Sequence, residues 1–278
     1  MSDRTMGASP PISLRLQAFV TAVVLFAGVT GVALFVFVRS THRFFSWALG
    51  PPPLSALIGG LYLASAVSFG LALLQGSWEA LRGLCVASLA LAVPTLAVSI
   101  IDHETFDFGR WQAWGWFALF GAATVTLATS LHAPLLDRGP QMAALRPGAR
   151  VLVAALAAGY AGLAIALWAG ADPLPFPLPD FGRHFLGCWM TFLSVLGVWT
   201  AARNDWDEAS SALVALVAHP AAALVSGVRS ITGMAPVSGR VSYLGALTGL
   251  TLLSFGLLVM GRQTPLAPLV DVDAGDSP

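Results

Sequence analysis

The chain has 278 residues, of which 56% are hydrophobic and only 10% are charged, whereas soluble domains carry roughly 25% charged residues. Its 14 basic side chains are all arginine, and 14 acidic residues bring the formal net charge to zero. The composition predicts a polytopic membrane protein with the lipid bilayer as its surroundings, in the cell (inner or plasma) membrane. It gives nucleic-acid binding no electrostatic support.

Eight apolar runs follow a polar N-terminal segment, residues 1–15. Each run is long enough to cross a hydrocarbon core of about 30 Å at about 1.5 Å per residue. The first is too long for the core of a signal peptide and has no small-residue cleavage site, so we expect it to remain as a helix. The predicted fold class is all-α, a polytopic transmembrane helix bundle with spans at 16–38, 54–74, 81–101, 111–130, 151–170, 184–202, 209–228 and 241–260.

The sequence contains an internal repeat. Four unlike features recur 128 residues later: Pro51 as Pro179, Gly59 as Gly187, Trp78 as Trp206 and Glu79 as Asp207. Four helices per unit is an even number, so both units start and end on the same side and form two parallel four-helix repeats. We predict a first repeat over 16–130, a linker loop over 131–149, a second repeat over 150–260 and a disordered C-terminal tail over 261–278.

The distribution of arginines predicts the orientation. The side with both termini carries eight arginines against six on the other, and three of the eight lie near the central loop, Arg138, Arg146 and Arg150. The positive-inside rule therefore places both termini in the cytoplasm. Cys85 and Cys188 then lie near opposite ends of their helices, too far apart for a disulfide.

Small and aromatic residues predict which surfaces pack. A stripe of small residues at steps of four predicts that one face of the second helix packs on protein, and it consists of Ala56, Gly60, Ala64, Ser68 and Ala72. Gly245 and Gly249 form a GxxxG pair in the last helix. Aromatic rings at the membrane interface are expected in the link over 39–53 and at Trp111, Trp114 and Trp116.

His219 is the ionisable side chain closest to the predicted bilayer midplane, where such residues usually serve a pathway or a pocket. Prolines interrupt the third and seventh helices at Pro94 and Pro220, and paired broken helices point to a site at the midplane. We therefore predict His219, Pro220 and Pro94 as ligand-binding residues. The structural alternative is a neutral imidazole bonded to a carbonyl that Pro220 leaves without its amide.

Three other polar clusters have ordinary structural explanations. The turn containing Asp102, His103, Glu104 and Asp107 has metal-capable side chains, but it lacks an i, i+4 histidine pair and a counterpart in the second repeat, which favours a solvated loop. Each Trp-acid pair fits an aromatic belt and a helix start, or a paired site for a partner. Asp180, Arg183 and His184 either attract a ligand or cap a helix.

The sequence contains no G-x-S-x-G, Walker A, CxxC or H-E-x-x-H motif. A membrane enzyme also needs at least two polar groups that converge at one depth. We therefore predict a protein that is not an enzyme, with no catalytic residues, no cofactor and no metal.

Two segments that precede helices, Trp47 to Gly60 and Phe176 to Gly187, carry a resemblance to uncharacterised multi-pass membrane proteins of actinomycetes. Those proteins have a W-P-L-x-P-L-x-x-R-x-x-G-like stretch ahead of a helix, often twice. The second segment, with Pro177, Pro179 and Arg183, is nearer to that pattern than the first, which lacks the first proline. The resemblance covers about half of the chain; it implies an eight-helix protein of the cell envelope and brings no activity.

These features favour a non-catalytic membrane scaffold or a lipid- or small-molecule-binding protein, with a membrane-protein partner or a homo-oligomer among its interactions. The alternative is a small-molecule transporter with a site between the two repeats near His219. A transporter needs a polar cavity there, whereas a scaffold should be filled.

Overall fold

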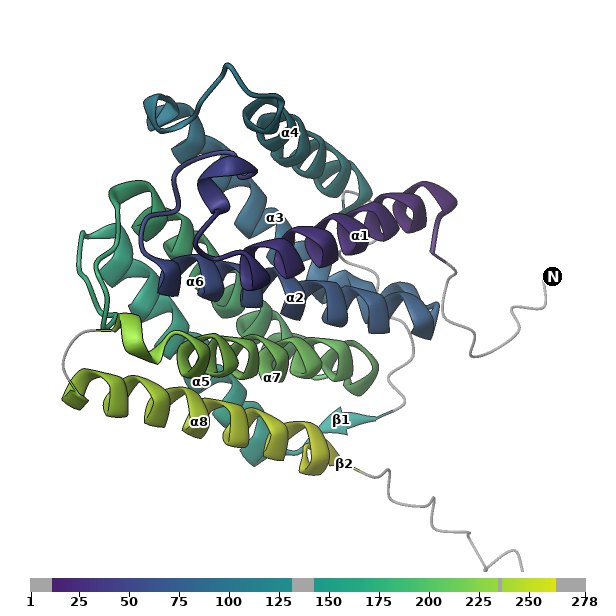
Figure 1. The fold of residues 1–278 in the computed structure, drawn as a ribbon. Coiled ribbons are helices and arrows are strands. Elements are labelled where there is room, and N and C mark those ends of the chain that lie inside the picture. Colours follow the sequence, from purple (N-terminus) through teal and green to yellow (C-terminus); the bar gives the residue numbers. More distant parts are fainter. Residues whose placement is uncertain (1–11, 132–142, 235–236, 264–278) are drawn as a thin grey trace, which may run out of the picture.

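The computed structural model describes residues 12–131, 143–234 and 237–263, and long helices running side by side dominate these segments (Figure 1). Each of the eight long helices is apolar enough to cross a membrane. The all-α transmembrane bundle predicted from the sequence is confirmed. The helices are α1 (Leu14–Val36), α2 (Pro52–Gln75), α3 (Trp78–Ile101), α4 (Trp111–Leu131), α5 (Pro147–Trp168), α6 (Asp180–Arg203), α7 (Trp206–Arg229) and α8 (Val237–Met260).

Neighbouring helices pack in pairs, α1 on α2, α3 on α4, α5 on α6 and α7 on α8. The two halves of the chain meet where α2 packs on α7 and α3 packs on α6. In Figure 1, α1 and α4 lie towards one side of the bundle and α5 and α8 towards the other. The core is therefore built mainly from α2, α6 and α7, while α1, α4 and α8 turn most of their surface outward.

Five helices, α3, α5, α6, α7 and α8, begin three or four residues before the spans predicted from hydropathy, and polar caps or prolines stand at the start of several of them. Ser77 accepts a hydrogen bond from the amide of Ala80 at the start of α3, and Asp205 accepts one from Asp207 at the start of α7. Such side chains satisfy amides that have no partner within the helix. Helix α5 begins with Pro147, whose fixed φ suits the first turn.

Two short strands differ from the predicted linker and tail. Strand β1 (Ala144–Leu145) pairs antiparallel with β2 (Arg262–Gln263), and the amide of Arg146 donates to the carbonyl of Gly261 at 2.8 Å. Residues 144–146 and 261–263 are thus paired with each other, and Pro147 already belongs to α5. Most of the polar N-terminal segment, the middle of the linker and the predicted disorder of the tail fall on 1–11, 132–142 and 264–278, outside the described residues.

The small-residue stripe of α2 packs on protein as predicted. All five of its residues are buried, and a side-chain carbon at Gly60 would lie only 3.0 Å from the carbonyl oxygen of Ala222 in α7. Gly245 and Gly249 behave differently, since both are exposed. Nothing in the described chain lies within 4 Å of a carbon added at either glycine.

The aromatic residues divide between the surface and the core. Trp111 and Trp114 are exposed at the start of α4, as an aromatic belt requires. Trp116 is buried, and so are Phe45 and Trp47 in the link between α1 and α2. The rings of Trp47 and Trp116 meet edge to face with centroids 4.5 Å apart. Phe45, Trp47 and Trp116 therefore pack against protein and are not part of an exposed aromatic belt, because the link folds over the end of the bundle.

Candidate functional site

His219 lies in the middle of α7 and is only 1% exposed. Its Nδ1 is 2.8 Å from the carbonyl oxygen of Ala215, and its Nε2 is 3.2 Å from the hydroxyl of Ser65 in α2. A carbonyl can only accept, so Nδ1 carries the proton; in the neutral ring Nε2 then accepts from Ser65. Both ring nitrogens are thereby satisfied within the protein.

The sequence also suggested that the imidazole bonds to the carbonyl that Pro220 leaves without its amide, but the carbonyl that it contacts is a different one. Pro220 removes the amide that would reach Leu216, four residues earlier. The imidazole instead bonds to Ala215, whose own helical partner is the amide of His219. The histidine therefore fastens α7 to α2 but does not compensate for the proline.

The imidazole also forms part of an aromatic wall. Its ring centroid lies 5.6 Å from that of Trp189 and 5.4 Å from that of Phe192, both in α6. Ser65, Trp189 and Phe192 face one cavity, whereas His219 faces another. The wall made by these four side chains thus separates two cavities.

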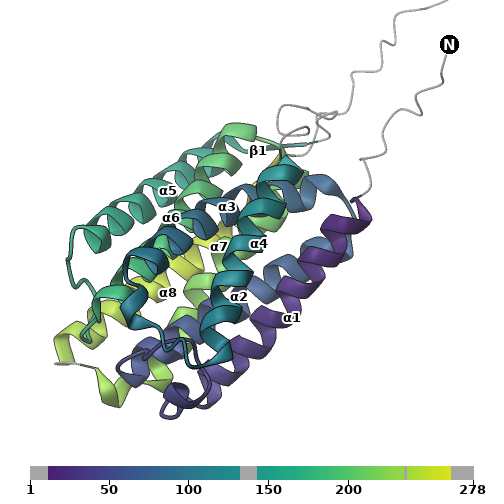
Figure 2. The same cartoon turned by 90° about the horizontal axis from the view of Figure 1, so that it is seen from above.

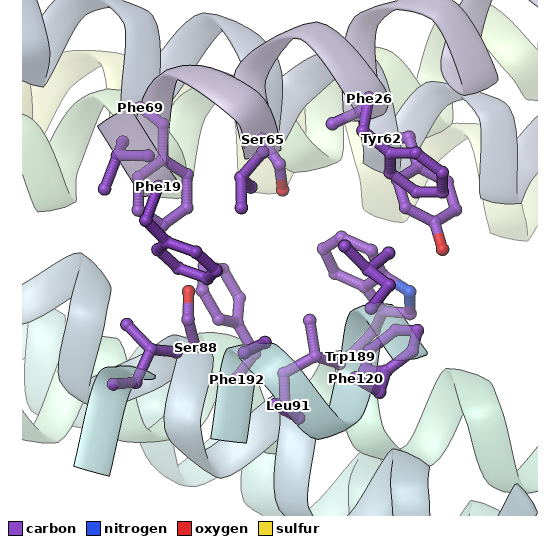
Figure 3. Close-up of a pocket in the computed structure, with 17 residues that line it drawn as sticks. Phe19, Phe26, Tyr62, Ser65, Phe69, Ser88, Leu91, Phe120, Trp189 and Phe192 are labelled. Atoms are coloured by element: carbon purple, nitrogen blue, oxygen red, sulfur yellow. The ribbon is translucent and has the colours of Figure 1, made fainter. Parts of the chain in front are cut away.

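The first cavity, which we call cleft 1, has a volume of about 90 Å³ and lies between α1, α2, α3, α4 and α6. Figure 3 shows side chains from two layers of helices facing one another across it. The hydroxyls of Ser65 and Ser88 are polar groups at its edge in this view. Tyr62 adds a third hydroxyl, and the rest of the lining is mainly aliphatic and aromatic, including Phe19, Phe26, Phe69, Leu91 and Phe120.

The second cavity, cleft 2, has a volume of about 100 Å³ and lies between α2, α5, α6, α7 and α8. It is again mainly apolar, with His219, Tyr160 and Tyr243 as its polar side chains. Six pairs of lining residues, with one member in each cleft, are 128 positions apart: Leu61 and Trp189, Tyr62 and Met190, Ser65 and Leu193, Leu91 and His219, Ala92 and Pro220, and Leu119 and Leu247.

The structure brings together two of the three predicted ligand-binding residues. His219 and Pro220 both line cleft 2. Pro94 is half-buried in α3 and is not among the residues that line either cleft.

A buried charge cluster lies where α3 and α7 begin and α6 ends, and the sequence reading missed it. Arg82 and Glu208 form an ion pair with side chains 2% and 1% exposed. The other carboxylate oxygen of Glu208 accepts from Arg203 Nε at 3.2 Å and from Trp199 Nε1 at 3.1 Å. Arg82 and Glu208 both lie in the first turns of long helices, and that position could have indicated the pair. The predicted helices started too late in the chain for this to be recognised.

Asp205 lies beside this charge cluster at the start of α7. Burial raises the pKa of its carboxyl, while the amide of Asp207 and the charges of Arg82 and Arg203 act in the opposite direction. The carboxyl caps α7 through its bond to that amide.

The two Trp-acid pairs occupy unlike environments. Trp78 and Glu79 are buried, whereas Trp206 is half-buried and Asp207 is exposed. The acid that enters the charge cluster is Glu208, one residue after the predicted equivalent of Glu79. The sequence pairing is thus not matched by a pairing of environments.

The remaining predicted polar residues tie loops to helices at the other end of the bundle. Arg183 reaches Asp180 at 2.7 Å and Asp172 at 3.0 Å. His184 lies 3.4 Å from Asp102 and stacks on Trp168.

The turn between α3 and α4 gives no cluster of metal ligands. Asp107 pairs with Arg110 at 3.2 Å, and His103 and Glu104 are exposed. Three histidine, cysteine, aspartate or glutamate side chains do not converge anywhere in the described segments. Cys85 and Cys188 are free and buried.

Comparison with models of protein families, with curated proteins and with solved structures found no match. The class of the protein therefore follows from its own architecture, an integral membrane protein with eight candidate membrane-spanning helices. The two clefts and the wall between them are its candidate functional site.

Proposed function

We propose that this protein is a non-catalytic membrane protein that holds apolar chains of membrane lipids in clefts 1 and 2. The observation that carries this proposal is the pair of apolar cavities within the membrane-spanning helices. Apolar pockets with a few polar groups are the usual form of a binding site for an apolar ligand. Acyl chains are the abundant apolar ligands of a bilayer.

The chemistry of the wall favours lipid chains over a polar solute. His219 uses both ring nitrogens in contacts with Ala215 and Ser65, so binding a polar ligand there would break one of them. An apolar chain in either cleft needs no hydrogen bond and leaves the wall intact. The transporter alternative, which requires a polar cavity near His219, is therefore the weaker proposal.

We further infer that the chain consists of two parallel four-helix repeats. The pairing of α1 with α2 corresponds to that of α5 with α6, and the packing of α2 on α7 corresponds to that of α6 on α3. Equivalent positions line the two clefts. With α1–α4 superposed on α5–α8, Gly59 is expected over Gly187 and Trp78 over Trp206, each within one helical turn.

A matched pair of substitutions in α4 tests the lipid proposal. Ala123 lines cleft 1, while Ala122 is exposed on the same helix. We expect Ala123→Phe to fill the cleft and to reduce crosslinking to a phosphatidylcholine with a photoreactive group in its acyl chain. Ala122→Phe should leave crosslinking within cleft 1 unchanged.

The readout is the position of the crosslink, mapped by mass spectrometry of peptides from α1, α3, α4 and α6. Wild-type crosslinks confined to the outer lipid-facing side chains, or equal labelling of cleft 1 in both variants, would contradict the proposal. Folding of each variant is checked by its thermal unfolding transition.

A further inference from the structure

The groove between the start of α5 and the end of α6, which we call the α5–α6 groove, lies apart from the two clefts. It has a volume of about 630 Å³ and is lined at one end by Arg150, Asn204 and Gln263 and along its length by Val151, Ala154 and Val198. Leu145 of β1 and Gln263 of β2 also line it, and Figure 1 shows these strands at one end of the bundle. From this arrangement we propose that the groove binds an anionic phospholipid, with the phosphate at Arg150 and an acyl chain along its valines.

Arg150 lines this end of the groove, and Arg146 and Arg262 lie nearby, in or beside the paired strands, without lining it. Arg150 is held in place because its Nε donates to the carbonyl of Ala201 at 2.7 Å. Arg146 Nε donates to the backbone carbonyl of Arg262 at 3.2 Å, which brings the strand of Arg262 beside the start of α5. All three arginines are exposed.

These charges are not neutralised within the described part of the chain. The ion pairs of residues 12–131, 143–234 and 237–263 engage Arg82, Arg110, Arg183 and Arg203, and none involves Arg146, Arg150 or Arg262. No aspartate or glutamate lines the groove. Asn204 Oδ1 accepts from the amide of Leu145, so the group that Asn204 can offer a ligand is its NH₂ donor. The groove therefore presents donors and positive charge to an anion.

The apolar length of the groove selects a phospholipid over a free anion. Val151 is 68% exposed and Val198 57% exposed, and both line the groove. They lie on helices that span the membrane, so their exposed surface faces lipid. Basic pockets between transmembrane helices near a membrane surface bind anionic headgroups. A lipid phosphate at Arg150 would place its chain against these valines.

The test compares phosphatidylglycerol with phosphatidylcholine as ligands of the purified full-length protein in neutral detergent, followed by thermal stability. A ligand that binds only the folded state raises the unfolding temperature with concentration. We expect phosphatidylglycerol to act at lower concentration than phosphatidylcholine, and Arg262→Gln to weaken its apparent affinity on the order of fivefold. Arg262 is suited to this test because its hydrogen bonds with β1 and with Arg146 use only its backbone atoms.

Two further variants control for charge and position. Arg150→Lys keeps the positive charge and should retain the preference for phosphatidylglycerol at least in part, whereas Arg150→Gln should lose it. Arg43→Gln removes an exposed arginine from the opposite end of the bundle and should leave the preference unchanged. Higher salt should weaken binding, because exposed charges are screened.

Three results would overturn the proposal. Equal effects of the two lipids would show that charge is not recognised. Equal protection by inorganic phosphate would mean that the groove holds a free anion and does not select a lipid. Residues 264–278 carry Asp271, Asp273 and Asp276; a preference that emerges only after their deletion would identify the tail as the occupant.

Discussion

At the scale of single residues, we expect substitution of Arg82 or Glu208 to lower the stability of the protein most. Each is nearly inaccessible to solvent, and each supplies the charge that compensates for the burial of the other. Removing one partner of such a pair costs about 3–5 kcal/mol, since the remaining charge stays buried alone. Arg203 and Trp199 also bond to Glu208, so the loss of this carboxylate affects three side chains.

We therefore expect Glu208→Gln to lower the free energy of unfolding by about 3–5 kcal/mol. The measurement is thermal or denaturant unfolding of the purified protein in detergent. Asp207→Asn is the matched control, because Asp207 is its exposed neighbour, and it should change stability by less than about 0.5 kcal/mol. The double variant Arg82→Met/Glu208→Leu should be more stable than either single variant; similar stability of Glu208→Gln and Asp207→Asn would contradict this account.

His219 offers a second prediction at this scale. Ser65→Ala removes the donor to Nε2 and should cost on the order of one hydrogen bond, roughly 0.5–1.5 kcal/mol, and His219→Gln should cost a similar amount. In a double-mutant cycle, the two substitutions together should cost less than the sum of their separate effects. Ser88→Ala also removes a hydroxyl from cleft 1 and serves as the control.

The same variants distinguish a structural from a ligand-binding His219. If His219→Gln leaves stability unchanged and abolishes stabilisation by a polar small molecule, the transporter alternative gains the support that it now lacks. A destabilised variant that still binds lipid is the expected outcome.

At the scale of elements, close contacts between helix backbones depend on single glycines. A side-chain carbon at Gly59 in α2 would lie 2.7 Å from the amide nitrogen of Phe35 and 2.9 Å from the carbonyl oxygen of Gly31, both in α1. Backbone atoms cannot turn aside as a flexible side chain can, so any larger residue separates the two helices. Small residues at such crossings are the usual basis of helix association in membranes.

Gly59→Ala should consequently destabilise the protein by on the order of 1–3 kcal/mol, as overpacking does. Gly70→Ala in the same helix is the control. A carbon at Gly70 would have its nearest contact at 4.0 Å, with Val24, and alanine favours helix over glycine by roughly 0.5–1 kcal/mol. Unfolding midpoints of the two variants should move in opposite directions, and a Gly59→Ala protein as stable as wild type would argue against this packing of α1 on α2.

The features of the fold differ in how well the sequence predicts them. Long apolar runs identify all eight candidate membrane-spanning helices, because the length of an apolar run depends only on residues that are neighbours in the sequence. The small residues of α2 likewise predicted which face of this helix packs on protein. The pairing of Arg82 with Glu208 and the two clefts depend on which helices meet, and that is set by contacts between distant parts of the chain. The burial of Phe45 and Trp47 could not be predicted, because packing by a folded loop leaves no periodic pattern in the sequence.

At the scale of the whole molecule, the start of α1 and the end of α8 lie at the same end of the bundle (Figure 2). That end also carries the exposed Arg146, Arg150 and Arg262. Basic residues are concentrated on the cytoplasmic side of membrane proteins. We therefore still predict that both termini are cytoplasmic.

Reporter fusions check this orientation. Fusions after His132 and after Asp271 should both report the cytoplasm, and a fusion after Gly170, in the loop between α5 and α6, should report the opposite side. An external signal from either of the first two sites would be incompatible with this topology.

The pairing of β1 with β2 has a consequence for the order of synthesis. These strands lie next to α5 and α8, and the bond between Arg146 and Arg262 joins residues 116 positions apart. The ribosome must finish α8 before β2 exists, so α5, α6 and α7 enter the membrane while the partner of β1 is still missing. The pairing of β1 with β2 can therefore occur only after α8 is made, and it closes a long loop, whose entropic cost grows only slowly with length. A ribosome stalled before Arg262 would hold a chain with every helix made and this ring still open.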